Sequence, residues 1–252
     1  SVQSHLAPIL EAQEAHIRDL EKQSPGHRKL MMLVRQNSNS ALTLGNRVEI
    51  LQDAGTFYTK MIDDIRAARS SIHLQYYIWR EDEFTESLRD ILVAKAEEGV
   101  EVRLLCDPVG SHMPIRRRYF QTMRAGGIQV ASTSPIYQLH TISYRNHRKI
   151  TVIDGKIGYT GGMNIGQEHL APGGWRDTQI RLTGPGAALL QTVFLVDWYN
   201  AVRENLFSPA YLPEESIRAA EGGVPVQILT AGPDSRWAAI RQLYSQMIVS
   251  AQ

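Results

Sequence analysis

The sequence contains one cysteine, lacks long apolar runs and carries almost no net charge. Cys106 is the only cysteine, so no disulfide can form within the chain, and its place in the run VRLLC predicts a buried strand residue. No apolar run approaches the ~18 residues that a membrane-spanning helix needs. A net charge of +1 and a pI near 7.9 do not suggest bulk attraction to nucleic acid or anionic lipid, so any such attraction must come from a local patch.

In other respects the composition is that of an ordinary globular protein. Hydrophobic residues make up 43% of the chain and charged residues 21%. A chain of 252 residues can bury a sizeable core in one or two domains. The first residue is Ser1 rather than methionine, so we expect a processed or engineered fragment.

The most informative stretch is YRNHRKITVIDGKIGYTGGMN, residues 144–164. His147, Lys149 and Asp154 stand there in the order H-x-K-x4-D, and Gly162 and Asn164 follow. An imidazole can attack a phosphodiester, while an ammonium and an amide can hold its oxygens. The pattern therefore predicts a site for phosphodiester chemistry.

The residues around this motif predict how it is held. Residues 149–153 are mostly β-branched and end at Asp154-Gly155, which predicts a strand that enters a tight turn, and 157–160 predict the returning strand. Side chains two positions apart on a strand face the same side, so His147 and Lys149 are expected to project together. Gly161-Gly162 would let the backbone approach a ligand closely.

A lone H-x-K pair has a simpler interpretation, as part of a solvated strand edge. His27-Arg28-Lys29 is such a pair, but Val34 stands where the acid should be and no Gly-Gly-x-Asn follows. We interpret that stretch as a chance match. At 147–164 six chemically suitable residues fall in one pattern, which favours the functional interpretation.

The sequence NHRKITVIDGKIGYTGGMNIG resembles the HKD motif of the phospholipase D superfamily, in the form carried by the first half of bacterial cardiolipin synthases. The HKD element alone would indicate the superfamily and not the substrate. The resemblance covers roughly residues 44–200 and includes GNRVEIL (45–51), IHLQYYIW (72–79), GVEVRLLCD (99–107), WRDTQIRLTGP (175–185) and FLVDW (194–198).

From residue 46 onward, strand patterns alternate with helix patterns, one of them beginning at an expected N-cap, Thr56. This alternation predicts a sheet covered by helices on both faces. The resemblance implies an α/β fold of the phospholipase D type, an αβα sandwich with a mixed sheet. We expect a helical lead-in or linker at 1–43, the lobe with the HKD motif at 44–204 and an inter-lobe linker at 205–223.

The tail, residues 224–252, is expected to be the truncated start of a second lobe. Val226-Gln227-Ile228-Leu229 repeats the pattern of Val48-Glu49-Ile50-Leu51, and a helix pattern follows each of them. A generic strand-loop-helix pattern is the alternative interpretation. The repeat agrees with the resemblance, because members of the family have two lobes with one HKD motif each.

The resemblance also implies roles for the motif residues, in a phosphatidyl transfer that uses no metal ion and no cofactor. His147 would attack phosphorus and form a phosphohistidine. Lys149 and Asn164 would bind the phosphate oxygens and neutralise charge that grows in the transition state. Asp154 would support the strand turn or the lysine rather than touch the substrate.

Asp177 is the candidate for a supporting acid. A nucleophilic histidine works better when a carboxylate holds its second nitrogen and fixes the tautomer. In relatives an acidic residue about this far beyond the HKD histidine has that role. The alternative is a simple ion pair of Asp177 with Arg176 or Lys156.

Substrate-binding residues are expected at Gly162 and in a cluster of arginines, Arg116, Arg117 and Arg118. Guanidinium groups match the geometry of phosphate oxygens, so the cluster is a candidate site for an anionic headgroup. A solvated helix with its arginines on the wet side is the alternative.

The resemblance implies a cardiolipin synthase-type phosphatidyltransferase that makes cardiolipin and glycerol from two phosphatidylglycerols at the bacterial cell membrane. Its partners would be anionic phospholipid, the membrane surface and a second HKD lobe in the same or another chain. The isolated chain is expected to be inactive. Cardiolipin synthases of this type commonly carry N-terminal membrane helices, and this sequence departs from that pattern, which leaves membrane attachment open.

Two other functions stay open at this point. One is a single-motif phosphodiesterase or nuclease of the phospholipase D type that works as a dimer. The near-neutral charge argues against nucleic acid as a partner. The other is a non-catalytic fragment that docks on membranes, against which the intact set of motif residues argues.

Overall fold

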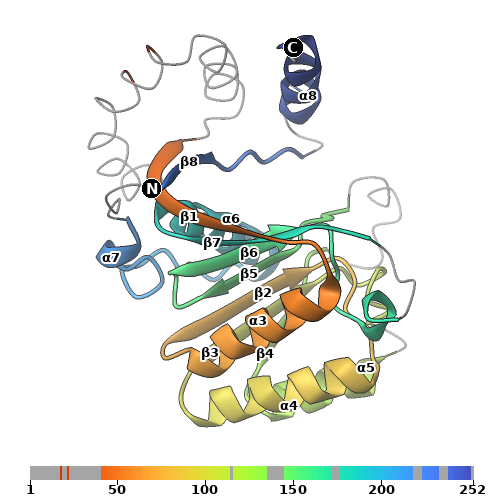
Figure 1. Cartoon of the computed structure of the whole chain (residues 1–252). Coiled ribbons are helices and arrows are strands. Elements are labelled where there is room, and N and C mark those ends of the chain that lie inside the picture. Colours follow the sequence, from red (N-terminus) through yellow and green to blue (C-terminus); the bar gives the residue numbers. More distant parts are fainter. Residues whose placement is uncertain are drawn as a thin grey trace.

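The chain folds around one mixed sheet with helices on both of its faces (Figure 1). The computed structural model describes residues 41–113, 116–134, 145–171, 176–217, 223–232 and 238–250, together with positions 18 and 22. The helical lead-in expected at 1–43 lies almost wholly outside the described residues. The sandwich with a mixed sheet, expected from the sequence, is confirmed.

Within the described residues the sheet has the strand order β4-β3-β2-β5-β6-β7-β1-β8. The pairs β2–β3 and β3–β4 are parallel, and the other neighbouring pairs are antiparallel. The strands are β1 (Leu42–Leu51), β2 (Ser71–Tyr76), β3 (Glu101–Cys106), β4 (Gln129–Ser132), β5 (Ile150–Ile153), β6 (Ile157–Gly161), β7 (Gln179–Thr183) and β8 (Val224–Gln227).

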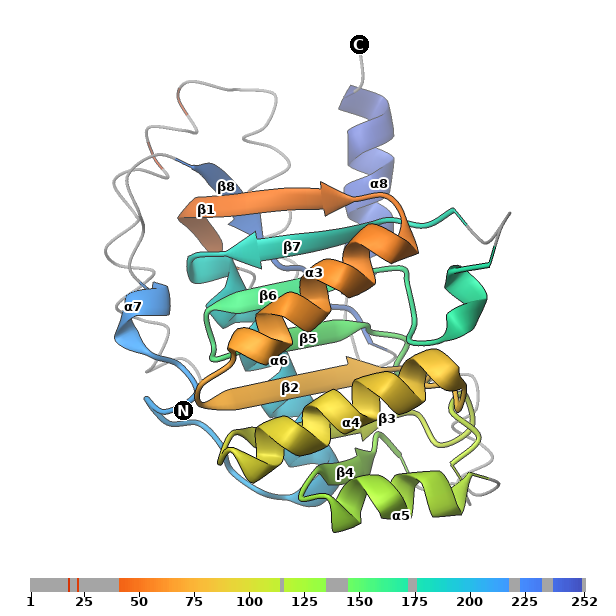
Figure 2. The ribbon, with the colours of Figure 1, turned by 60° about the horizontal axis from the view of Figure 1, so that its bottom comes forward.

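Helices α3 (Ala54–Ala67), α4 (Glu83–Glu97) and α5 (Arg117–Ala125) cover one face of the sheet, and α6 (Pro185–Val202) crosses the other (Figures 1 and 2). Strands covered on both faces are expected to be apolar along their length rather than alternating. Every residue of β2 and β5 is buried, but only β5 comes close to this expectation, because β2 carries the buried polar residues Ser71, His73 and Gln75.

The core on the first face is built from one side of α3. Phe57, Met61 and Ile65 follow each other at helical spacing and have no exposed surface. On the second face, Phe194 and Trp198 of α6 pack into a smaller apolar cluster. Burying one such side chain stabilises the fold by about 1.5–3 kcal/mol, so the two clusters fix the sheet between its helices.

β8 is an edge strand of this same sheet. It pairs antiparallel with β1, with Thr43 opposite Val226 and Asn46 opposite Val224. Asn46 Nδ2 donates to the Val224 carbonyl at 3.1 Å. A short helix, α7 (Glu214–Ile217), lies in the expected linker. The division of the chain into two lobes and a linker stays a prediction, and Leu42 and Thr43, expected in the lead-in, belong to β1.

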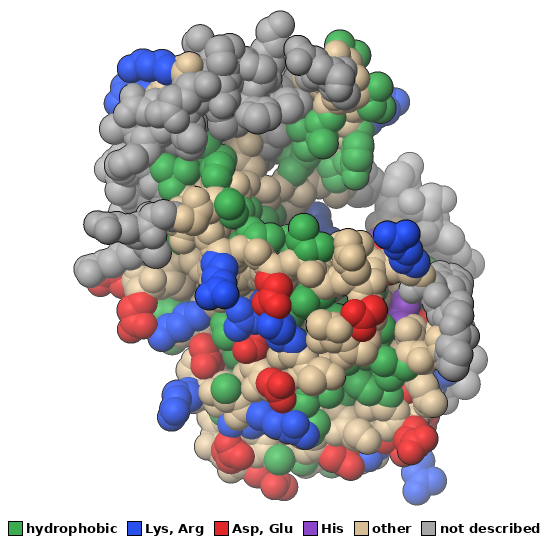
Figure 3. Space-filling model, in the orientation of Figure 1, with side chains coloured by type: hydrophobic (Ala, Val, Ile, Leu, Met, Phe, Trp, Pro, Cys, Tyr) green, Lys and Arg blue, Asp and Glu red, His purple; other side chains and the backbone are tan. Residues whose placement is uncertain are grey.

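The last described helix, α8 (Ala239–Ser250), projects beyond the edge of the sheet (Figures 1 and 2). Its side chains Tyr244, Met247, Ile248 and Val249 are exposed, and Figure 3 shows apolar surface gathered there. An apolar stripe on a helix normally packs against another element. The tail therefore carries an apolar face that is largely exposed in this chain.

Candidate active site

His147 and Lys149 lie together immediately before β5. Lys149 Nζ lies 2.9 Å from His147 Nδ1 and donates a hydrogen bond to the His147 carbonyl at 2.8 Å. The strand was expected to begin at Lys149 and instead begins at Ile150. The expected meeting of the two side chains is nevertheless present.

The surroundings lower the pKa of both side chains. Desolvation is the main cause of the lowered pKa of His147, and the Lys149 ammonium adds to it, while Asp107 acts in the opposite direction. Desolvation also lowers the pKa of Lys149, against the attraction of Asp177. An unperturbed histidine has a pKa of about 6.5, so His147 with its lowered pKa is neutral at pH 7 and has a lone pair for attack.

Tyr77 forms a wall of this site that the sequence did not predict. Its ring lies on the His147 imidazole, with centroids 3.8 Å apart and planes at 32°. Lys149 Nζ lies 5.8 Å from the centre of the same ring. Gly110 makes room for Tyr77, because a Cβ there would come within 2.4 Å of the Tyr77 carbonyl oxygen. Tyr77 follows β2 in the chain, and only the fold brings it to His147.

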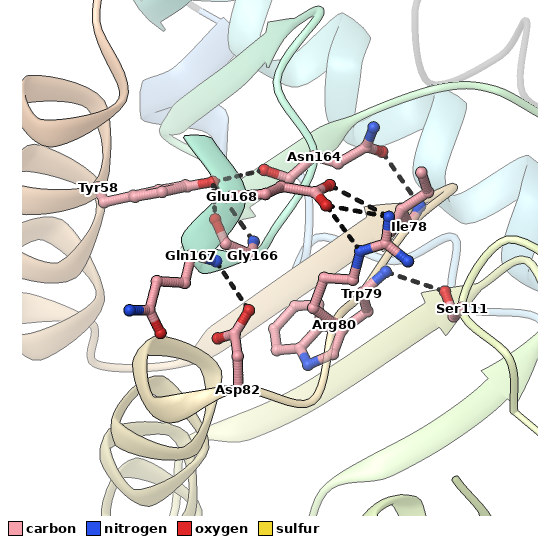
Figure 4. A network of polar contacts seen from close by, with 10 residues as sticks. All are labelled: Tyr58, Ile78, Trp79, Arg80, Asp82, Ser111, Asn164, Gly166, Gln167 and Glu168. Carbon is pink, nitrogen blue, oxygen red and sulfur yellow. Dashed lines mark hydrogen bonds and ion pairs between the residues drawn. The ribbon is translucent and has the colours of Figure 1, made fainter. Parts of the chain in front are cut away.

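Asn164 is oriented by backbone contacts (Figure 4). Its Oδ1 accepts the Ile78 N–H at 3.0 Å, and its carbonyl accepts the Tyr58 hydroxyl at 2.7 Å. Because an N–H donor must face the amide oxygen, the Nδ2 group of Asn164 points to the other side, where it can donate to a phosphate oxygen. Ile78 is the neighbour of Tyr77, so these contacts link Asn164 to the wall beside His147.

The turn after Asn164 is tied to the end of β2 by polar contacts (Figure 4). Arg80 forms an ion pair with Glu168 at 3.0 Å, and Asp82 accepts the Gln167 N–H at 2.7 Å. Ser111 Oγ accepts the Trp79 N–H at 3.0 Å, within the segment that follows β2. The first two contacts hold the segment after Asn164 against the segment that follows β2.

Asp154 lies at the other end of β5 from Lys149. Its carboxylate accepts the backbone N–H groups of Arg69, Ser70 and Ser71 at 2.7–3.2 Å and the Ser70 hydroxyl at 2.9 Å. Burial raises its pKa, but these hydrogen bonds outweigh burial and lower it. Asp154 therefore joins the turn between β5 and β6 to the start of β2, and the role expected for it at the site stays a prediction.

Replacing Asp154 with asparagine is expected to lower the free energy of unfolding at pH 7 by about 1–2 kcal/mol. This is less than fully buried hydrogen bonds to a charged group would contribute, because solvent screens a partly exposed carboxylate. Asp154 has a positive φ of 52°, which asparagine also tolerates, so the substitution does not strain the backbone. The lowered pKa stabilises the fold above the pKa of the unfolded state, and this contribution disappears as pH falls through the folded-state pKa.

Urea unfolding at pH 7 and at pH 3 measures this difference. The loss of stability in Asp154→Asn should be smaller at pH 3, which lies below the unfolded-state pKa, than at pH 7. Asp63→Asn is the matched control, because Asp63 is exposed and forms a long ion pair of 3.8 Å with Arg66. Equal stability of Asp154→Asn and Asp63→Asn at pH 7 would contradict the assignment.

Asp177 lies beside Gly162. A Cβ at Gly162 would come within 2.1 Å of Asp177 Oδ1, and the Gly162 N–H donates to the Thr178 carbonyl at 3.0 Å. Asp177 attracts the Lys149 ammonium, and the described contacts include no hydrogen bond between Asp177 and His147. The roles of Asp177 and Gly162 stay predictions; the structure adds that the missing side chain at 162 makes room for this carboxylate.

The arginine cluster lies at the beginning of α5. Arg117 and Arg118 are exposed, and Arg116 is half-buried with its Nε 3.9 Å from a carboxylate oxygen of Glu81. Exposed guanidinium groups are able to bind phosphate oxygens. Their role in substrate binding stays a prediction.

Neither a helix that could span a membrane nor a metal-ligand cluster occurs in the part of the chain that the structure describes. No described helix is long and apolar enough to cross a bilayer. The described His, Cys, Asp and Glu side chains do not gather in groups of three or more that could hold a metal ion.

Comparisons with known proteins agree with this geometry. A cardiolipin synthase of Alkalihalophilus pseudofirmus is 38% identical over 240 residues, which cover 92% of this chain and 47% of that protein. The major cardiolipin synthase of Bacillus subtilis is 38% identical over 235 residues, which cover 90% of this chain and 48% of that protein. This chain thus spans about half the length of the relatives that it matches.

A solved structure shares the fold. The phosphatidylserine synthase of Haemophilus influenzae superimposes with a TM-score of 0.57 at 14% identity, covering 90% of this chain and 58% of that one. The family model described as the phospholipase D-like domain of cardiolipin synthase matches residues 61–181, which include the HKD motif at 147–164. The chain therefore contains a phospholipase D-like domain of the cardiolipin synthase family.

Proposed function

We propose that this chain is the first half of a phosphatidyltransferase that makes cardiolipin and glycerol from two phosphatidylglycerols. The observation that supports this most directly is the 2.9 Å approach of Lys149 Nζ to His147 Nδ1 inside the matched domain. Asn164 is linked to the same place through Ile78 and Tyr77. Both substrates are anionic phospholipids, so the enzyme works at the surface of the bacterial membrane.

In the first step, a ring nitrogen of His147 attacks the phosphorus of one phosphatidylglycerol. The new N–P bond forms while the P–O bond to glycerol breaks, and the leaving oxygen takes a proton from a second histidine. In the second step, that histidine takes a proton from a hydroxyl of another phosphatidylglycerol. The oxygen then attacks phosphorus, cardiolipin forms and His147 is released unchanged.

Lys149 and Asn164 stabilise the charge that develops on the non-bridging oxygens. Lys149 is 6% exposed. Because water screens a buried charge only weakly, its ammonium interacts more strongly with a phosphate than an exposed ammonium would. Asp177 keeps Lys149 charged and orients it, and we propose that it also meets His147 once substrate is bound. The arginines at 116–118 bind the anionic headgroup of a lipid.

The test is transfer by the full-length protein with detergent-dispersed phosphatidylglycerol labelled in its terminal glycerol. Labelled glycerol and cardiolipin are expected to form in equal amounts, with or without excess chelator, because the proposed steps use protein side chains alone. Single-stranded DNA is the alternative substrate. DNA cleavage without cardiolipin would instead support a dimeric HKD nuclease, and loss of transfer in chelator would contradict the proposed steps.

A further inference from the structure

The segment that carries the nucleophile lies outside the sheet. Residues 145–149 precede β5, and the ladder between β5 and its neighbours begins at Ile150. Backbone pairing therefore does not fix His147 and Lys149. Side chains of the same segment must hold it in place, so the partners of Arg145, Asn146 and Arg148 become relevant.

Asp197 of α6 binds this segment on both sides of His147. Its Oδ2 accepts Asn146 Nδ2 at 2.8 Å, and Arg148 Nη1 lies 2.6 Å from Oδ2 and 2.9 Å from Oδ1. Gln75 Nε2, from β2, donates to the same Oδ2 at 2.7 Å. One carboxylate thus joins α6, the central strand β2 and the two residues that flank His147.

The contacts alternate along the segment. Asn146 and Arg148 bind Asp197, whereas His147 and Lys149 meet each other and the ring of Tyr77. Asp197 is thereby in contact with both neighbours of His147 but not with its imidazole. Such an arrangement holds the chain on both sides of His147 and leaves the imidazole free to react.

A second buried acid anchors the beginning of the segment. Asp107 has no exposed surface and forms an ion pair of 3.0 Å with Arg145 Nη1. Asp107 also accepts the Val109 and Gly110 N–H groups at 2.9 Å, in the loop that packs on Tyr77. The segment is therefore attached to the scaffold at residues 145, 146 and 148, and Asp197 supplies two of these three attachments.

We propose that Asp197 is a positioning residue, which aims His147 at the reacting phosphorus by holding Asn146 and Arg148. Its catalytic consequence rests on the phosphatidyl transfer proposed above. Displacing a reacting group by about 1 Å can cost about 10²-fold in rate, so loss of this clamp should reduce turnover strongly even though Asp197 does not touch the imidazole.

A carboxylate of this kind also stabilises the fold, and a matched control separates the two effects. Asp64 is 16% exposed and Asp197 12%, and each binds an arginine with both carboxylate oxygens. Asp64 holds Arg181 at 2.7 and 3.0 Å and accepts the Tyr159 hydroxyl, on the α3 side of the sheet. Asp64→Asn should therefore lower stability about as much as Asp197→Asn without moving residues 145–149.

The position of His147 can be read without any assay of activity. Its imidazole proton signals, identified by their loss in His147→Ala, should be shifted upfield by the Tyr77 ring in the 252-residue chain. In Asp197→Asn this ring-current shift is expected to shrink, and in Asp64→Asn to remain. Arg148→Gln removes the ion pair with Asp197 from the arginine side and should reduce the shift as Asp197→Asn does. It replaces Asp197→Asn in the test if that variant does not fold.

In the full-length protein, Asp197→Asn should lower kcat about 100-fold with KM nearly unchanged, while Asp64→Asn keeps kcat per folded molecule. Unchanged His147 signals in both Asp197→Asn and Arg148→Gln would overturn the positioning role, whatever the rates. Absence of cardiolipin formation by the unmutated protein would remove the proposed function instead, and the proton signals would still decide the role of Asp197.

Discussion

Alanine in place of His147 is expected to abolish phosphatidyl transfer in the full-length protein, lowering kcat by at least about 10³-fold. The imidazole forms the bond to phosphorus, and an alanine methyl group cannot. The fold should persist, because His147 is exposed and substitutions of exposed residues usually change stability by within about 0.5 kcal/mol. Loss of activity with an unchanged unfolding midpoint is therefore the expected combination.

Trapping the intermediate gives the second measurement. After brief reaction with phosphatidylglycerol labelled at phosphorus, the label should sit on His147 in an acid-sensitive form and be absent from His147→Ala. His112→Asn is a matched control, because His112 is an exposed histidine outside the motif with a φ of 50° that asparagine tolerates. Undiminished turnover of His147→Ala would remove the nucleophile assignment.

The sequence predicted the fold class because periodicity and turn chemistry are local properties. The β5–β6 hairpin follows from Asp154-Gly155, where both residues have positive φ and the Lys156 N–H closes the turn on Ile153. The start of α3 was misplaced. Asp53 is the N-cap in place of the expected Thr56, because its Oδ1 accepts the Thr56 N–H at 2.7 Å.

The site was predictable only in part. His147 and Lys149 are two positions apart, so sequence spacing was sufficient to bring them together. Tyr77 and Asp197 come from the end of β2 and from α6, and no spacing rule connects them with residue 147. A signal existed for Asp197 in hindsight, since Asn146 and Arg148 are polar, alternate with the motif residues and need partners.

The isolated 252-residue chain is expected to form no cardiolipin. In one step, His147 cannot be both the nucleophile that binds phosphorus and the acid that protonates the leaving oxygen. Two histidines are therefore needed at one phosphorus. His147 alone heads a complete H-x-K-x4-D pattern in this sequence, because the pair at His27 has Val34 in place of the acid.

The tail supplies the physical reason to expect association of this chain. Tyr244 is 62% exposed and Ile248 74%, on a helix that projects past the edge strand β8. Burying such a side chain is worth about 1.5–3 kcal/mol, so covering α8 should favour dimers. Tyr244→Lys combined with Ile248→Lys should shift the chain toward the monomer, as measured by sedimentation velocity.

Activity of such a dimer decides between two architectures. If α8 merely brings chains together, the two copies of His147 stay apart, and the purified chain produces neither cardiolipin nor free glycerol from phosphatidylglycerol micelles. The full-length protein, assayed alongside, is expected to take the second histidine from its own second lobe and to turn over. Comparable turnover by the short chain, lost in the Tyr244→Lys, Ile248→Lys variant, would mean that two copies of His147 meet across a dimer. The half-enzyme interpretation would then be wrong, and one HKD motif per chain would suffice.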